Sequence, residues 1–182
     1  MADILIPTVA QGLMWALMAL GVYITFRVLD IADLSVEGSF PLGAAVAATA
    51  LVSGYGIVVA FVLAAVAGAL AGVVTGILTT KLKIPPLLAG ILTMIGLYSI
   101  NLHVMGKANV ALLRVDTVFS YAGALGLSSD MAMMIVGLAG VLLVGVVLYW
   151  FFGTELGTAV RATGCNSQMA RAQGVNLSLI HI

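Results

Sequence analysis

Long apolar blocks with very few charged residues are the feature that most constrains the fold of this 182-residue chain. The residues are 63% hydrophobic and only 8% charged, against roughly 25% charged residues in an ordinary soluble domain. A soluble fold must cover its surface with polar side chains, and 7 acidic and 7 basic residues cannot do this. An apolar block of about 20 residues spans the bilayer core as a helix. The sequence therefore predicts an all-α, polytopic bundle of membrane helices.

The apolar blocks predict five spans. Lys81 and Lys83 close the third span. Pro86 opens the fourth, since proline suits the first turn of a helix, and this span fades near Asn101 and His103. The predicted spans cover about residues 9–26, 34–52, 57–80, 85–101 and 131–152.

The distribution of Lys and Arg predicts the orientation, because these residues are enriched in cytoplasmic loops. In the five-span arrangement, Lys107 and Arg114 fall on one side of the membrane. The other side receives Arg27, Lys81, Lys83, Arg161 and Arg171. We therefore expect the N-terminus outside and the segment after residue 152 in the cytoplasm.

Small residues recur at every fourth position of the third span, at Ala60, Ala64, Gly68, Gly72, Gly76 and Thr80. Small side chains let helix backbones approach closely in lipid. We interpret this strip as a packing seam within the chain, with a subunit interface as the alternative.

The start of the second span is unusually polar. Asp30, Asp33 and Glu37 lie just before or within it, although a carboxylate at the bilayer centre costs a few kcal/mol. Pro41 cannot donate a hydrogen bond to the Glu37 carbonyl, and Gly38 loosens the same turn. The sequence thus predicts a broken second helix that lines a polar path. The candidate path residues are Asp33, Ser35, Glu37 and Ser39.

A structural role for the same acidic residues stays open. Asp30 and Asp33 would then lie at the cytoplasmic interface, with Asp33 or Ser35 capping the second helix.

Residues 155–176 are polar enough to leave the bilayer, yet too rich in Ala, Met and Leu for an unstructured loop. We expect two short helices hinged at Gly164, the second capped at its start by Asn166 and ended by Gly174. Such a rigid cytoplasmic elbow suits protein docking. The alternative is an amphipathic helix that lies on anionic lipid through Arg161 and Arg171.

The pattern from Glu155 to Asn176 is E-L-G-x-x-x-R-A-x-G-x-N-x-x-x-A-x-x-x-G-V-N. It resembles the cytoplasmic coupling segment of binding-protein-dependent ABC importer permeases, in the branch of branched-chain amino acid and ribose permeases. Asp33-Leu34-Ser35-Val36-Glu37-Gly38-Ser39 is similar to the Asp-Leu-Ser-Val-Gly-Ser element of the sugar members, with Glu37 inserted. With the following Phe40-Pro41-Leu42-Gly43-Ala44, Glu37 resembles more the amino-acid permeases related to tryptophan and tyrosine uptake.

The resemblance implies a permease subunit in a bacterial inner membrane that forms the path for a small solute, an amino acid or a related compound. The implied partners are ABC ATPase subunits, an extracytoplasmic solute-binding protein and a second permease subunit, expected to form a homodimer, within the lipid bilayer. The implied ATPase-coupling residues are Gly157, Arg161, Ala162, Gly164, Asn166, Ala170 and Gly174.

The resemblance covers residues 1–176, which we interpret as part of a transmembrane permease domain with its coupling segment at 155–176. The family pattern would continue toward another span, whereas this chain ends on Leu-Ser-Leu-Ile-His-Ile at 177–182. One frame of a common transposon-end sequencing adapter encodes this hexapeptide, so we expect a C-terminally truncated permease with a non-native tail. The alternative is an ordinary end of a short protein. Native source DNA with a stop after codon 182 would support that alternative.

No enzyme, metal or cofactor signature competes with this interpretation. The phosphate-loop pattern G-x-x-x-x-G-K-[ST] is missing from the sequence, so ATP hydrolysis would need a partner subunit. His103 and His181 have no partner at metal-ligand spacing, and the single Cys165 excludes a multi-thiolate site. A net charge of zero gives no basic surface for nucleic acid. We expect neither an enzyme nor a bound cofactor.

The competing function is a secondary carrier or channel with Asp33 and Glu37 as ion-coupled sites. Such a protein has no ATPase to bind, so the elbow discriminates between the two functions.

Overall fold

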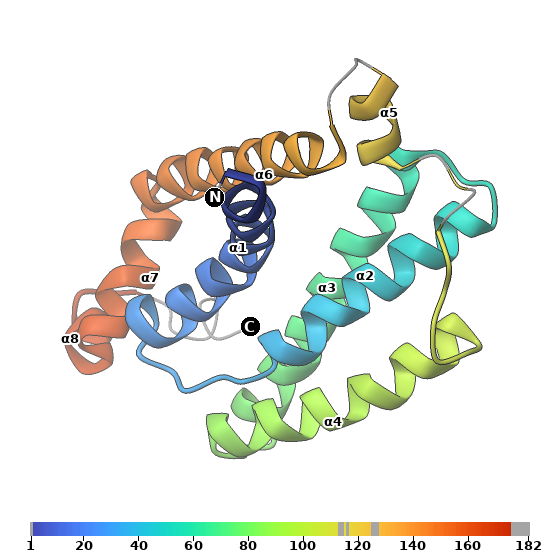
Figure 1. The fold of residues 1–182 in the computed structure, drawn as a ribbon. Helices are drawn as coiled ribbons and strands as arrows, with labels where there is room; N and C mark the ends of the chain where they lie inside the picture. Colours follow the sequence, from blue (N-terminus) through green and yellow to red (C-terminus); the bar gives the residue numbers. More distant parts are fainter. Residues whose placement is uncertain (1, 113–114, 116, 125–127, 176–182) are drawn as a thin grey trace.

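The computed structural model describes residues 2–112, 115, 117–124 and 128–175, and the elements in these ranges are helices joined by loops (Figure 1). In chain order they are α1 (Ala2–Tyr23), its π-helical continuation η1 (Ile24–Val28), α2 (Val36–Val52), α3 (Ile57–Thr80), α4 (Pro86–Met105), α5 (Val118–Ala124), α6 (Ser129–Gly153), α7 (Glu155–Cys165) and α8 (Ser167–Ala172). The expected tail at 177–182 lies outside the described residues.

Four segments of the described chain are long and apolar enough to cross a membrane, namely Ile4–Val28, Ile57–Thr80, Pro86–Met105 and Ser129–Gly153. The remaining predicted span, the second one at 34–52, corresponds to α2, a shorter apolar helix. Large apolar side chains face outward along these helices, as at Val58 (76% exposed) and Val146 (67% exposed). Apolar surface on this scale requires lipid or another protein around it. The all-α membrane bundle predicted from sequence is confirmed.

The spanning helices pack in two groups. In the first, α1 lies along α6, and a Cβ added at Gly137 of α6 would lie 3.0 Å from the Leu13 Cβ of α1. In the second, α2 packs against both α3 and α4 around Leu42, Ala71 and Leu97 (Figure 1).

A buried hydrogen bond strengthens the second group. The Thr75 hydroxyl of α3 and the Thr93 hydroxyl of α4 lie 3.0 Å apart. Such bonds satisfy polar groups that have no hydrogen-bond partner in lipid.

The small-residue strip of α3 forms the predicted seam only in part. Ala60 is buried, but Cβ atoms added at Gly68 and Gly72 would meet nothing within 4 Å, and Ala71 and Thr75 are buried instead. An α-helix turns about 100° per residue, so positions four apart drift by about 40° at each step. The strip of residues four apart therefore turns away from the packed face of α3. The packed face continues through residues spaced alternately three and four apart, including Ala71 and Thr75.

The break predicted within the second helix is also corrected. The helix α2 is continuous through Gly38 and Pro41, and the irregular chain lies before it, at residues 29–35. Pro41 removes one hydrogen bond to Glu37 near the helix start, a loss that packing on two neighbouring helices offsets. Gly38 serves that packing, because a Cβ there would lie 2.8 Å from the Met94 Cα of α4.

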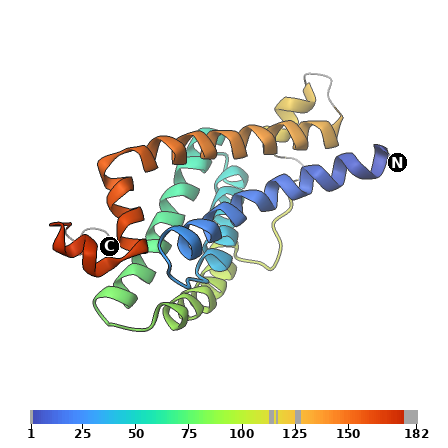
Figure 2. The same cartoon turned by 90° about the vertical axis from the view of Figure 1, so that its left-hand side faces the viewer.

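Basic residues concentrate at one end of the bundle. Figure 2 shows α7, α8 and the turn between α3 and α4 at the end opposite the N-terminus and α5. Lys81 and Lys83 lie in that turn, Arg161 in α7 and Arg171 in α8, whereas Lys107 lies in the connection from α4 to α5. We propose from this distribution that the α7–α8 end is cytoplasmic.

Cysteine labelling tests this orientation. Ala162 and Ala108 are both exposed, and each can be replaced by cysteine in a Cys165→Ala background. A membrane-impermeant maleimide should label position 108 from outside intact cells and position 162 only after the membrane is opened. The reverse pattern would place α7 outside and remove it from any cytoplasmic partner.

Candidate functional site

The segment that joins η1 to α2 is held by the Asp33 carboxylate. Its Oδ1 accepts a hydrogen bond from the Ser35 N–H (2.8 Å), and its Oδ2 accepts one from the Ser35 hydroxyl (2.9 Å). A carboxylate at the N-terminal end of a helix is favoured by the helix dipole. Both oxygens of Asp33 therefore bond to Ser35, the N-cap residue of α2, but the Ser35 side chain makes no capping hydrogen bond to the helix.

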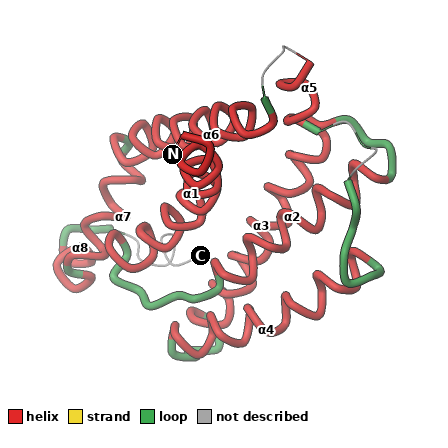
Figure 3. Tube along the Cα trace, in the orientation of Figure 1, coloured by secondary structure: helices red, strands yellow, loops and turns green. Residues whose placement is uncertain are grey.

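This segment is the green loop that leads into α2 in Figure 3. It docks against α4 at Gly90. A Cβ added at Gly90 would lie 2.7 Å from the Asp33 Oδ1, 2.7 Å from the Leu34 nitrogen and 3.2 Å from the Ser35 nitrogen. Only glycine leaves room for this approach. The start of α2 is thus fixed on α4, and Ser35 is 6% exposed.

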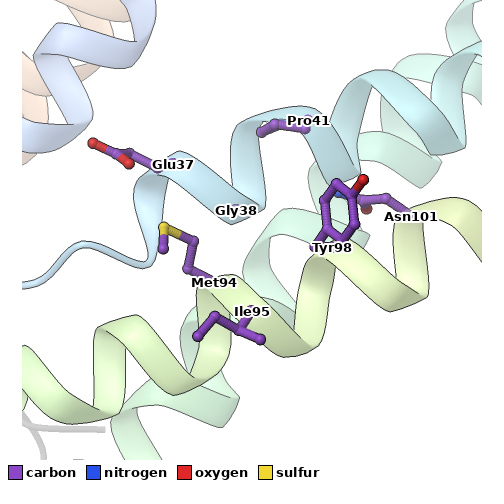
Figure 4. Close-up of a pocket in the computed structure, with 7 residues that line it drawn as sticks. All are labelled: Glu37, Gly38, Pro41, Met94, Ile95, Tyr98 and Asn101. Carbon is purple, nitrogen blue, oxygen red and sulfur yellow. The ribbon is translucent and has the colours of Figure 1, made fainter.

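A pocket of about 330 Å³ lies between α2 and α4 (Figure 4). Its lining residues come from these two helices and are Glu37, Gly38, Pro41, Met94, Ile95, Tyr98 and Asn101. Figure 4 shows Tyr98 and Asn101 together at one end, while the Glu37 carboxylate extends away from them at the other.

Of the four predicted path residues, three have polar groups close to other groups of the same segment and one lines the pocket. Asp33 and Ser35 are bonded to each other, and the Ser39 hydroxyl lies 3.4 Å from the Val36 carbonyl. Glu37 is exposed and is the member of this set that lines the pocket.

Asn101 is the polar pocket residue that the sequence reasoning did not select. Its side chain is 7% exposed, and within the described part of the chain its Oδ1 has no hydrogen-bond partner. The available signal was an amide inside an apolar span, where polar groups are costly. Its i,i+3 spacing from Tyr98 places both residues on one face of α4.

The two short helices predicted after the last span are present as α7 and α8. The Asn166 Oδ1 accepts a hydrogen bond from the Met169 N–H (3.0 Å) and caps α8, and Gly174 follows with φ 86°. The predicted hinge at Gly164 is wrong, since Gly164 lies inside α7. The bend occurs at Asn166, whose backbone is extended (φ −160°, ψ 100°), because its side chain replaces the helical hydrogen bonds at that point.

The glycines of the elbow are explained by close packing. A Cβ added at Gly164 would overlap the Val28 carbonyl oxygen and lie 3.1 Å from the Leu29 Cα, so α7 rests directly on the end of η1. A Cβ at Gly157 would overlap the Phe151 carbonyl oxygen and lie 2.6 Å from the Phe152 Cα at the end of α6. The elbow is therefore joined to both α1, through η1, and α6.

Basic and apolar side chains are exposed on the elbow. Of the predicted coupling residues, Arg161, Ala162, Asn166 and Gly174 are exposed, whereas Gly157 and Ala170 are buried. Leu156 and Met169, which the pattern did not select, are 65% and 61% exposed.

An open pocket of about 550 Å³ lies at the corner between α6 and α7. Arg161 lines it together with aromatic and small residues of the α6 end, namely Tyr149, Trp150, Phe152, Gly153 and Thr154. Aromatic side chains of this kind suit the membrane–water interface.

Within the described ranges, no group of three or more His, Cys, Asp and Glu side chains is placed to hold a metal ion. The arrangement offers a largely apolar pocket with a few polar groups between α2 and α4, and an elbow packed on η1 and α6.

Comparison with known proteins gives the family. Residues 4–182 match the family described as branched-chain amino acid transport system / permease component. The chain is 40% identical over 178 residues to a tyrosine transport system permease protein of Clostridioides difficile (strain R20291), covering 98% of this chain and 58% of that protein. It is 34% identical over 167 residues to an uncharacterized protein of Rickettsia prowazekii (strain Madrid E), covering 92% and 57%.

No solved structure matches the chain significantly. The chain spans less than two thirds of the length of these two relatives. The family match extends over nearly every residue, including both the α2 start and the elbow. The chain belongs to the family of permease components of branched-chain amino acid transport systems.

Proposed function

We propose that this chain is the permease subunit of a binding-protein-dependent ABC importer, forming a path for an amino acid or a related small solute. The observation that carries the proposal is the α7–α8 elbow, a capped pair of helices packed on η1 and α6 with exposed basic and apolar side chains. The name of the C. difficile relative, a tyrosine transport system permease, supports an amino-acid solute.

The elbow suggests how ATP hydrolysis in partner subunits would move the membrane helices. Partner ATPase subunits would contact its exposed side chains in the cytoplasm. Any movement of α7 would act directly on η1 through the contact of Gly164 with Val28, and on α6 through Gly157. Because η1 leads into residues 29–35, which dock on Gly90 of α4, both groups of helices are mechanically connected to the elbow.

The other partners follow from the importer class. An extracytoplasmic solute-binding protein would deliver the solute, and a second permease subunit, in our proposal an identical copy, would complete the path. The protein would be located in a bacterial inner membrane, and we propose it acts without enzymatic activity of its own.

Removing the Arg161 charge tests the docking role. A charge-assisted hydrogen bond contributes about 1.5–3 kcal/mol, and about 1.4 kcal/mol is a tenfold change in affinity. In the intact permease, Arg161→Gln should therefore weaken binding of the ATPase subunit by tenfold or more and reduce ATP-driven uptake. Lys107→Gln, which removes one positive charge from the connection after α4, is the matched control and should leave both unchanged.

Two results would contradict the proposal in different ways. Uptake that ignores ATP depletion but stops when the proton gradient is dissipated would favour a secondary carrier that uses Asp33 and Glu37. If Arg161→Gln leaves ATPase binding intact but abolishes the effect of anionic lipid on activity, α7 binds the membrane surface instead.

A further inference from the structure

The turn between α3 and α4 carries two positive charges that its own helices do not balance. Lys81 and Lys83 are both exposed. The sequence contains no Asp or Glu from residue 38 to residue 115, a range that includes all of α3, the turn and α4. Asp33 lies against α4, but both of its carboxylate oxygens are bonded to Ser35. The charge of the turn therefore suits an anionic partner from outside this helix pair.

The position of the turn limits what that partner can be. The helices α3 and α4 are both long and apolar enough to cross a membrane, and residues 81–85 join one directly to the other. Such a short connection between two spanning helices must lie at the level of the lipid headgroups. Leu82, between the two lysines, is 62% exposed. An apolar side chain flanked by lysines is typical of a segment that lies in the membrane interface, because lysine stems follow apolar surface while their ammonium groups reach the headgroups.

The backbone of the turn favours glycine where the chain has Lys83. The Ile84 N–H donates a hydrogen bond to the Leu78 carbonyl (3.1 Å) and closes the end of α3. Lys83 adopts the left-handed conformation in this closure, with φ 54°. Helix ends of this kind usually have glycine at the left-handed position, because a Cβ is strained there. The stability of the turn therefore does not explain a lysine at position 83.

We infer that the α3–α4 turn is a binding site for the headgroup of an anionic phospholipid. The ammonium groups of Lys81 and Lys83 donate to its phosphate oxygens, and Leu82 enters the adjacent acyl region. Each lysine near an anionic membrane surface raises the affinity about fivefold. The bound lipid holds the start of α4, the helix on which residues 33–35 dock. This inference goes beyond the proposed function, because it needs no ATPase subunit.

Native mass spectrometry of the intact permease resolves individual bound lipids and tests the site directly. In a titration with phosphatidylglycerol or phosphatidylcholine, the wild type should bind phosphatidylglycerol more tightly. Lys83→Gln should weaken the affinity for one phosphatidylglycerol about fivefold, and a further Lys81→Gln should remove that lipid. Lys83→Arg keeps the charge and should bind as the wild type does. Lys107→Gln is the matched control at the other end of the bundle and should also leave lipid binding unchanged.

Lys83→Gly separates the lipid site from the stability of the turn. In nanodiscs of phosphatidylcholine alone, this variant should melt a few degrees above the wild type, because glycine relieves the strain at φ 54°. Adding phosphatidylglycerol to the nanodiscs should raise the melting temperature of the wild type more than that of Lys83→Gly. A purely structural role of Lys83 predicts the same difference between the two proteins in both lipid compositions, and this result would overturn the inference.

Three further outcomes would also overturn the inference. The first is equal affinity of the wild type for the two lipids. The second is an equal loss of phosphatidylglycerol binding in Lys107→Gln, which would show an effect of net charge alone. The third is weaker ATPase binding in Lys83→Gln with unchanged lipid binding, which would make the turn a protein-docking surface. Lipid binding as expected, without ATP-driven uptake by the wild type, would instead overturn the proposed function and leave the lipid site.

Discussion

Gly164→Ala is expected to detach the elbow from η1 and uncouple ATP hydrolysis from transport. The added Cβ would overlap the Val28 carbonyl oxygen, and the Leu29 Cα is 3.1 Å away. These are backbone atoms, so no side-chain rotation relieves the overlap and α7 must move as a unit. Overpacking of this kind costs about 1–3 kcal/mol, which exceeds the gain of up to about 1 kcal/mol from replacing glycine in a helix.

The displacement can be measured with a spin label at position 162, which lies on the exposed side of α7. In a Cys165→Ala background, Gly164→Ala should increase the mobility of the label and reduce ATP-driven uptake of the intact permease, while its insertion into the membrane stays normal. Cys165→Ala alone is the matched control, because the same residue is introduced at the neighbouring exposed position of α7. Unchanged label mobility together with unchanged uptake would mean that the contact with η1 does not transmit movement.

Much of the elbow could be predicted because its signals are local. Asn166 and Gly174 act through hydrogen bonds and backbone conformations within a few residues, and such patterns are visible in sequence. The role of Gly164 is not local. Its partners lie in η1, more than a hundred positions earlier in the chain, so sequence alone suggested a hinge where the structure has close packing.

The start of α2 shows the same contrast between local features, which could be predicted, and contacts between distant segments, which could not. Apolar length predicted the spans, and three carboxylates identified the start of α2 as unusual. The two carboxylates differ in their surroundings although they are only four positions apart: Asp33 is bonded to Ser35, whereas Glu37 is exposed and lines a pocket. The pairing of Glu37 with Asn101 around one pocket depends on how α2 lies on α4, which no local pattern encodes.

Two glycines of α4 give the sharpest test of that helix pairing. Gly90→Ala and Gly96→Ala introduce the same methyl group into the same helix, and each gains up to about 1 kcal/mol of helix propensity. A Cβ at Gly96 would meet nothing within 4 Å, so this variant should be neutral or slightly more stable. At Gly90 the Cβ would lie 2.7 Å from the Asp33 Oδ1 and 2.7 Å from the Leu34 nitrogen. The overlap costs about 1–3 kcal/mol and outweighs the gain.

Gly90→Ala should therefore lower the melting temperature of the purified permease. Gly96→Ala should raise it slightly or leave it unchanged. Because the Gly90 contact holds the Asp33–Ser35 hydrogen bonds against α4, Gly90→Ala should also loosen the start of α2 and with it the Glu37 side of the pocket. Uptake should fall in Gly90→Ala and persist in Gly96→Ala. Equal melting temperatures would show that α4 can withdraw from residues 33–35 at no cost, and the two groups of helices would then lack the connection through Gly90.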